Sequence, residues 1–199
     1  FTIDTFFPAF AEVASSLHAN PWQMQQTISA SLIGYALMSF VHGPMSDAHG
    51  RRIVILFGVT SYIVASIVCT FAPNIEVLLA ARFWQGCSTG AGMNVGRAII
   101  RDRFHGGDAQ RVMAWVSMLF GIAPALAPLV GALIHSVASW RAIFAFMVVL
   151  LILGMFEGFT GYLLPWDQTS YWASVAGINI TGTGPFVGPF MAQILKAGA

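Results

Sequence analysis

Five long apolar stretches limit what this chain can fold into. They lie at roughly 24–42, 53–72, 77–100, 112–136 and 142–164. The second and fourth contain no Lys, Arg, Asp or Glu. A helix needs about 20 mostly apolar residues to cross the hydrocarbon core of a bilayer. The sequence therefore predicts five complete membrane-spanning helices.

The scarcity of charge supports the same interpretation. Only 9% of the 199 residues are charged, whereas 57% are hydrophobic, and a soluble domain has about 25% charged residues. So few charges cannot cover a globule of this size with a solvated surface. The net charge of +1 provides no basic patch, so nucleic acid is not an expected partner. Cys69 and Cys87 lie inside apolar stretches and are expected to be packing residues, not metal ligands.

The fold class predicted is all-α: a bundle of about six transmembrane helices. Residues 1–17 are expected to be the outer end of a further span, cut short and carrying Asp4 and Glu12. Short links predict that consecutive helices pack antiparallel. These links lie near 17–23, 43–52, 73–76, 101–111 and 137–141.

Basic residues predict the orientation of these spans. Arg51 and Arg52 lie in the link 43–52, and four more arginines lie in or beside 101–111. The outer links have no Lys or Arg except Arg141. Because basic loops stay on the cytoplasmic side, both arginine-rich links are expected to be cytoplasmic.

The link 43–52 reads GPMSDAHGRR. Gly43 and Pro44 are expected to end the first complete span, and Gly50 to permit a tight turn. Asp47 is expected to accept backbone hydrogen bonds where the next helical turn begins, and the arginines to meet anionic headgroups. A positive-inside loop explains the arginines but not the spacing G-x-x-x-D-x-x-G-R-R.

That spacing resembles the signature loop between the second and third helices of the major facilitator superfamily of secondary transporters. The resemblance implies that the loop is part of a cytoplasmic gate, whose acid forms contacts when the gate closes and breaks them when it opens. The gating residues implied are Gly43, Asp47, Gly50, Arg51 and Arg52.

The stretch LLAARFWQG resembles the fourth-helix motif of the same family, with Arg82, Gln85 and Gly86 at its positions. Placing a charged arginine inside a membrane span costs free energy, so Arg82 is expected to face a cavity or an acidic partner. The alternative is an arginine that snorkels to the outer interface. Small residues behind it predict close approach of a neighbouring helix; they are Gly86, Gly90, Gly92 and Gly96.

The stretch GIAPALAPLVG is similar to the Gly/Pro motif in the fifth helix of the family's antiporters. Its motif residues are Gly121, Pro124, Pro128 and Gly131. Two prolines inside a span remove backbone hydrogen bonds, for which neighbouring helices must compensate. A kink that serves packing alone is compatible with the same residues.

Within the superfamily, residues 1–155 most resemble the Bcr/CflA-like drug:proton antiporters, through IDTFFPAF, ARFWQG, VGRAIIRDRF and SWRAIF. The resemblance implies proton-driven export of small amphipathic molecules across the inner membrane. An enzyme is not expected, because the sequence has no nucleophile elbow, phosphate loop or metal-ligand spacing. Asp4 lies where this branch commonly has an acid, so it is a candidate for proton exchange opposite Arg82; the alternative is a hydrated carboxylate at a helix end. Because such carriers rock two halves about a central site, a second six-helix half is an expected partner.

Residues 156–199 have a different character. FTGYLLPWDQTSYW resembles cytochrome b near its quinol oxidation site, with matching positions at Gly161, Tyr162, Pro165, Trp166 and Trp172. The resemblance implies a chimera and an alternative function, a fragment of a quinol-oxidising subunit. Haem would be a cofactor only under that alternative, and the five histidines contain no pair with the family's spacing. The simpler interpretation is an irregular, amphipathic tail at the membrane interface.

Overall fold

The computed structural model describes residues 4–163, with side chains as far as residue 157. The chain divides into two compact units, 1–151 and 152–199. All packing described below lies within the first unit. Of the second unit, the described residues comprise the carboxyl-terminal part of one helix.

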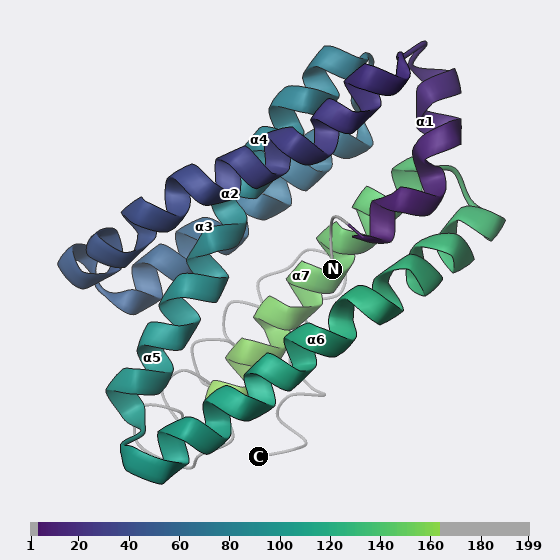
Figure 1. Cartoon of the computed structure of the whole chain (residues 1–199). Helices are drawn as coiled ribbons and strands as arrows, with labels where there is room; N and C mark the ends of the chain where they lie inside the picture. Colours follow the sequence, from purple (N-terminus) through teal and green to yellow (C-terminus); the bar gives the residue numbers. More distant parts are fainter. Residues whose placement is uncertain (1–3, 164–199) are drawn as a thin grey trace, which may run out of the picture. The chain divides into compact units, whose positions relative to one another are not determined.

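The elements between residues 4 and 163 are all helical (Figure 1). In chain order they are the 3-10 helix η1 (Asp4–Ala9), α1 (Phe10–Ser16), α2 (Pro21–His49), α3 (Arg51–Thr70), α4 (Ile75–Gly90), the π-helix η2 (Ala91–Val95), α5 (Gly96–Arg103), α6 (Gly106–Val137) and α7 (Arg141–Leu163).

Every predicted span forms helix. Among the described residues, α2, α3 and α6 are long and apolar enough to cross a membrane. The stretch 77–100 differs from the expected single helix, because the π-helical segment η2 divides it into α4 and α5. Figure 1 shows the ribbon of α4 continuing into α5. Segments of this kind are inserted into α-helices and are frequent at functional sites.

The corner at 43–52 is shorter than predicted. Gly43 and Pro44 do not end the first complete span, because α2 continues through both residues to His49. Pro44 removes one helical hydrogen bond, which a packed membrane helix tolerates, and Ser46 Oγ donates to the Gly43 carbonyl at 2.8 Å. The chain reverses at Gly50, whose φ of 88° is a conformation that glycine adopts without steric cost.

Glycines bring α2 and α4 into direct backbone contact. A methyl group at Gly34 would overlap the Phe83 carbonyl, and one at Gly86 would overlap the Ser31 carbonyl. Gly90 faces the buried ring of His42. The expected close approach is therefore confirmed at Gly86 and Gly90. It is wrong for Gly92 and Gly96, where a methyl group would meet no atom within 4 Å.

A buried apolar cluster joins η1 and α1 to α4 and to the start of α7. Phe6, Leu78, Trp140 and Phe144 are its largest apolar members, and each is at most 2% exposed. The rings of Phe6 and Phe144 lie 5.2 Å apart, within the range of favourable aromatic pairs. This cluster forms the surroundings of Arg82.

Candidate functional site

Arg51 is the centre of the corner between α2 and α3. Its guanidinium forms an ion pair with Asp47, which lies four residues earlier in the last turn of α2, and it also donates to Ser46 Oγ. Asp47 therefore does not cap the next helical turn, as the sequence had suggested. It lies in the last turn of α2, because that helix extends beyond Pro44.

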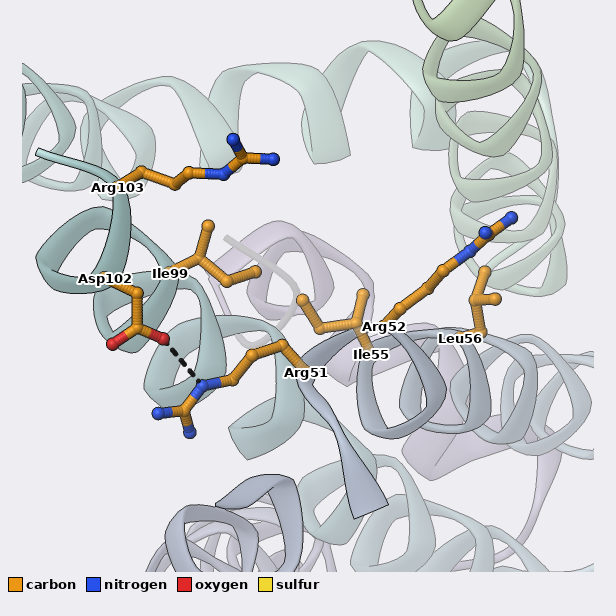
Figure 2. A pocket seen from close by; sticks show the side chains of 7 residues that line it. All are labelled: Arg51, Arg52, Ile55, Leu56, Ile99, Asp102 and Arg103. Carbon is orange, nitrogen blue, oxygen red and sulfur yellow. Dashed lines mark hydrogen bonds and ion pairs between the residues drawn. The ribbon is translucent and has the colours of Figure 1, made fainter. Parts of the chain in front are cut away.

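Arg51 also reaches a third helix. Its Nε donates to Asp102 Oδ2 at 3.0 Å, which joins the start of α3 to the end of α5 across 51 residues (Figure 2). Sequence reasoning missed Asp102 as a member of this site. The only signal for it was one acid between two arginines, Arg101 and Arg103. All three side chains of the Asp47–Arg51–Asp102 network are partly exposed, so each ion pair is weak enough to break and re-form.

Arg82 forms a second, deeply buried site on α4. The residue is 1% exposed, so it does not snorkel to the interface. Its Nη1 donates to Gln85 Oε1 at 3.0 Å. Gln85 Nε2 in turn donates to Ser66 Oγ on α3 at 2.8 Å. The motif pair Arg82 and Gln85 is thus one connected hydrogen-bond network.

The positive charge of Arg82 faces aromatic rings. Its guanidinium carbon lies 5.2 Å from the ring centre of Phe6 and 5.9 Å from that of Phe144, so both contacts are cation–π interactions. Among the described residues, no carboxylate lies within ion-pair distance of Arg82, and its Nε and Nη2 have no hydrogen-bond partner. A buried charge without an acid is expensive.

Asp4 begins η1, the element that carries Phe6. The structure therefore places the element of Asp4 against Arg82 through the Phe6 ring. It does not place the Asp4 carboxylate within ion-pair distance of that guanidinium.

The Gly/Pro motif lies on α6, which remains one continuous helix through Pro124 and Pro128. Gly131 packs directly against η1, because a methyl group there would overlap the Thr5 carbonyl. Gly121 has nothing within 4 Å of such a methyl group. The motif thus brings α6 against the element of Asp4 at one of its two glycines.

A polar contact between α1 and the turn that joins α6 to α7 was not predicted. Glu12 Oε2 accepts a hydrogen bond from the Trp140 backbone N–H at 2.9 Å and lies 3.1 Å from His135 Nδ1. Arg141 donates to the Ala72 carbonyl at 3.2 Å. These contacts fasten α1 and the end of α3 to the turn between α6 and α7. The sequence showed only isolated polar residues at helix ends.

The residues of the cytochrome b resemblance lie outside the described side chains. Gly161 and Tyr162 belong to the backbone of α7, whereas Pro165, Trp166 and Trp172 lie beyond the described residues. Among the described residues, no group of three or more His, Cys, Asp or Glu side chains is arranged to hold a metal ion.

Long apolar helices, short arginine-bearing corners and a buried charge on a glycine-packed helix define a helical membrane protein with polar sites between its helices. The sequence matches the Major Facilitator Superfamily over residues 1–172. The chain belongs to this family of membrane transporters, and it is not an enzyme.

Curated relatives agree with the family match. The chain is 36% identical over 158 residues to an uncharacterized MFS-type transporter of Bacillus subtilis, covering 75% of this chain and 39% of the relative. It is 33% identical over 145 residues to Multidrug resistance protein D of Escherichia coli, covering 73% and 37%. A chloramphenicol resistance protein of Pseudomonas aeruginosa is 32% identical over 178 residues, covering 89% and 41%.

The chain thus spans about two fifths of the length of these relatives, 39%, 37% and 41%. The family match runs to residue 172, past the predicted join near 155. The comparisons give no support to the cytochrome b resemblance or to a chimera. The domain boundary at 155 stays a prediction.

Proposed function

We propose that this chain forms the amino-terminal half of a drug:proton antiporter of the Bcr/CflA-like branch, which exports small amphipathic molecules across the inner membrane. Similar relatives support the substrate class. Their names are Multidrug resistance protein D, Bicyclomycin resistance protein homolog and Chloramphenicol resistance protein.

The observation that carries the proposal is the buried charge of Arg82. A guanidinium that is 1% exposed, with no carboxylate in ion-pair distance among the described residues, is costly to fold. Such a group is expected where a changing electrostatic partner is part of the mechanism. We assign Asp4 as the acid that exchanges protons, and Arg82 as the charge that responds to it.

Gln85 positions the Arg82 guanidinium. Its side chain accepts from Arg82 and donates to Ser66, so it ties the charge to both α4 and α3. Loss of this tie would leave the guanidinium free to change rotamer. Gly121, Pro124, Pro128 and Gly131 shape α6, the helix that packs on the element of Asp4.

The corner with Gly43, Asp47, Gly50, Arg51 and Arg52 is assigned as the cytoplasmic gate. Its ion pairs join α2, α3 and α5, and their partial exposure keeps the cost of breaking them low. The arginines support a cytoplasmic position for this corner. A gate needs contacts of this strength, because it must open in every transport cycle.

The second half of the carrier is the required partner. A transporter of this family binds its substrate between two halves that rock about the membrane midplane. We therefore expect proteoliposomes with this chain alone to show no proton-driven drug uptake. We expect uptake when the chain is co-reconstituted with the carboxyl-terminal half of Multidrug resistance protein D.

The matched variants for that assay are Asp4→Asn and Glu76→Gln. Asp4→Asn removes the proposed exchangeable proton and is expected to abolish uptake driven by a pH gradient. Glu76→Gln neutralises an exposed acid in the first turn of α4 and is expected to leave uptake unchanged. Proton-driven uptake by the chain alone, or full uptake by Asp4→Asn, would refute the assignment.

A further inference from the structure

A hollow of about 530 Å³ opens beside the Arg51–Asp102 ion pair (Figure 2). Residues from the first turns of α3 and the last turns of α5 line it. Its walls carry three guanidinium groups, those of Arg51, Arg52 and Arg103, but one carboxylate, that of Asp102. The lining therefore has an excess of positive charge.

The three arginines of the lining differ in whether they form ion pairs. Arg51 is neutralised by Asp102 and Asp47. Arg52 and Arg103 are exposed and form no ion pair among the described residues. Figure 2 shows both side chains extending away from the Arg51–Asp102 pair. Two cations are thus available to an anion from outside the chain.

Apolar side chains lie between these cations. Ile55 and Leu56 line the hollow from α3, and Ile99 lines it from α5. Leu56 is 44% exposed. A small soluble anion would gain nothing from contact with this apolar surface. A molecule with a charged head and an apolar body would cover both the charged and the apolar parts of the lining.

We propose that this hollow binds the headgroup of an anionic phospholipid of the cytoplasmic leaflet. Arg52 and Arg103 bind the lipid phosphate, and Ile55, Leu56 and Ile99 contact its glycerol and upper acyl carbons. Basic pockets between helices on the cytoplasmic side suit such headgroups, and that leaflet carries a negative surface potential. The inference uses the orientation in the proposed function but is independent of transport.

The test is native mass spectrometry of the purified chain in detergent, titrated with phosphatidylglycerol or with phosphatidylcholine. We expect one phosphatidylglycerol to bind well before others, with phosphatidylcholine much weaker. Each arginine near an anionic headgroup contributes roughly a 5-fold gain in affinity. The double variant Arg52→Gln/Arg103→Gln is therefore expected to weaken the first binding step by about 30-fold.

The matched control is Arg101→Gln/Arg111→Gln, which removes two exposed arginines from the same end without touching the lining. We expect a small change in the first binding step. An equal loss in both double variants would show general attraction to surface charge and would overturn the pocket. Arg103→Gln alone, with an expected loss of about 5-fold, provides a test with a smaller change to the fold.

Soluble phosphate compounds distinguish the source of the anion. Glycerophosphoglycerol, the headgroup without acyl chains, and inorganic phosphate are expected to leave the bound lipid in place. Displacement by either at concentrations comparable with that of the lipid would identify a soluble anion as the occupant and refute the lipid. Failure of the chain to transport drugs would not bear on either result.

Discussion

Arg51 donates through Nε to Asp102 at 3.0 Å, and this contact joins the first turn of α3 to the last turn of α5. Both side chains are partly exposed, so solvent screens the pair and its coupling energy is expected to be small. A double-mutant cycle with Arg51→Gln and Asp102→Asn, measured by denaturation in mixed micelles, is expected to give that coupling energy. The control cycle with Arg103→Gln and Asp102→Asn is expected to give none. A coupling energy above about 2 kcal/mol would show a desolvated pair, too strong for a gate.

Arg82 is expected to limit the stability of the chain. Arg82→Met keeps the length of the side chain and removes a charge that no described carboxylate neutralises. The free energy of unfolding is expected to rise by about 1–2 kcal/mol, after the lost hydrogen bond to Gln85 is included. Uptake in the co-reconstituted carrier is expected to disappear. Arg97→Met, on the exposed side of α5, is the control for both measurements. A less stable Arg82→Met protein would show that the favourable contacts of the guanidinium outweigh the cost of burying its charge, and would contradict this prediction.

Two glycines of the α6 motif are expected to differ in their sensitivity to substitution. Gly131→Ala pushes a methyl group into the Thr5 carbonyl and is expected to cost about 1–3 kcal/mol of stability. Gly121→Ala meets no atom within 4 Å and improves helix propensity by up to about 1 kcal/mol. Thermal unfolding of the two variants compares these costs on one helix. Equal melting temperatures would argue against the packing of α6 on η1.

Glu12 is expected to stabilise the turn between α6 and α7. Glu12→Ala removes the acceptor of the Trp140 N–H and is expected to cost about 2 kcal/mol. Glu12→Gln keeps an acceptor oxygen but removes the negative charge that lies 3.1 Å from His135 Nδ1, so about half of that cost is expected. Thermal unfolding distinguishes the variants, with the exposed Glu76→Ala as a control within about 0.5 kcal/mol of the parent. Equal costs for Ala and Gln would assign the effect to the charge and not to the backbone contact.

The orientation of the spans is testable with single cysteines in a background with Cys69→Ala and Cys87→Ala. His49→Cys lies at the arginine-rich corner, and Ser139→Cys lies in the turn before α7; both positions are exposed. A membrane-impermeant maleimide is expected to label Ser139→Cys in intact cells and His49→Cys only in opened membranes. Labelling of the His49 position from outside would reverse the topology and refute the proposed cytoplasmic gate.

The helical class and the positions of most apolar helices were predictable, because long apolar stretches between short polar links leave few alternatives. The division of 77–100 into α4, η2 and α5 was not predictable. The carboxyl-terminal end of α2 was not predictable. Gly43 and Pro44 usually end a helix, but α2 continues through both residues to His49. The role of Gly50 was predictable from glycine's access to positive φ.

The candidate sites were predictable only in part. The pairing of Asp47 with Arg51 was not predictable from their spacing, because Asp47 lies in the last turn of α2, Arg51 begins α3, and the chain reverses between them at Gly50. Asp102 and the Glu12–Trp140 contact were not predictable, because they depend on which helix ends meet in three dimensions. Arg82 is buried inside its helix bundle, but among the described residues it faces aromatic rings and not the acidic partner that the sequence led us to expect. Its aromatic neighbours, Phe6 and Phe144, come from elements far apart in the sequence.

The π-helical segment Ala91–Val95 controls which way α5 faces. Successive residues of an α-helix are rotated by about 100° about the helix axis. An inserted residue therefore rotates every side chain that follows it to a different face of the helix. Deletion of a single residue from this segment would rotate Asp102 away from the helix face that contacts Arg51, although neither of these two residues would change. The contact between Asp102 and Arg51 therefore depends on a π-helical insertion that lies about two helical turns before Asp102.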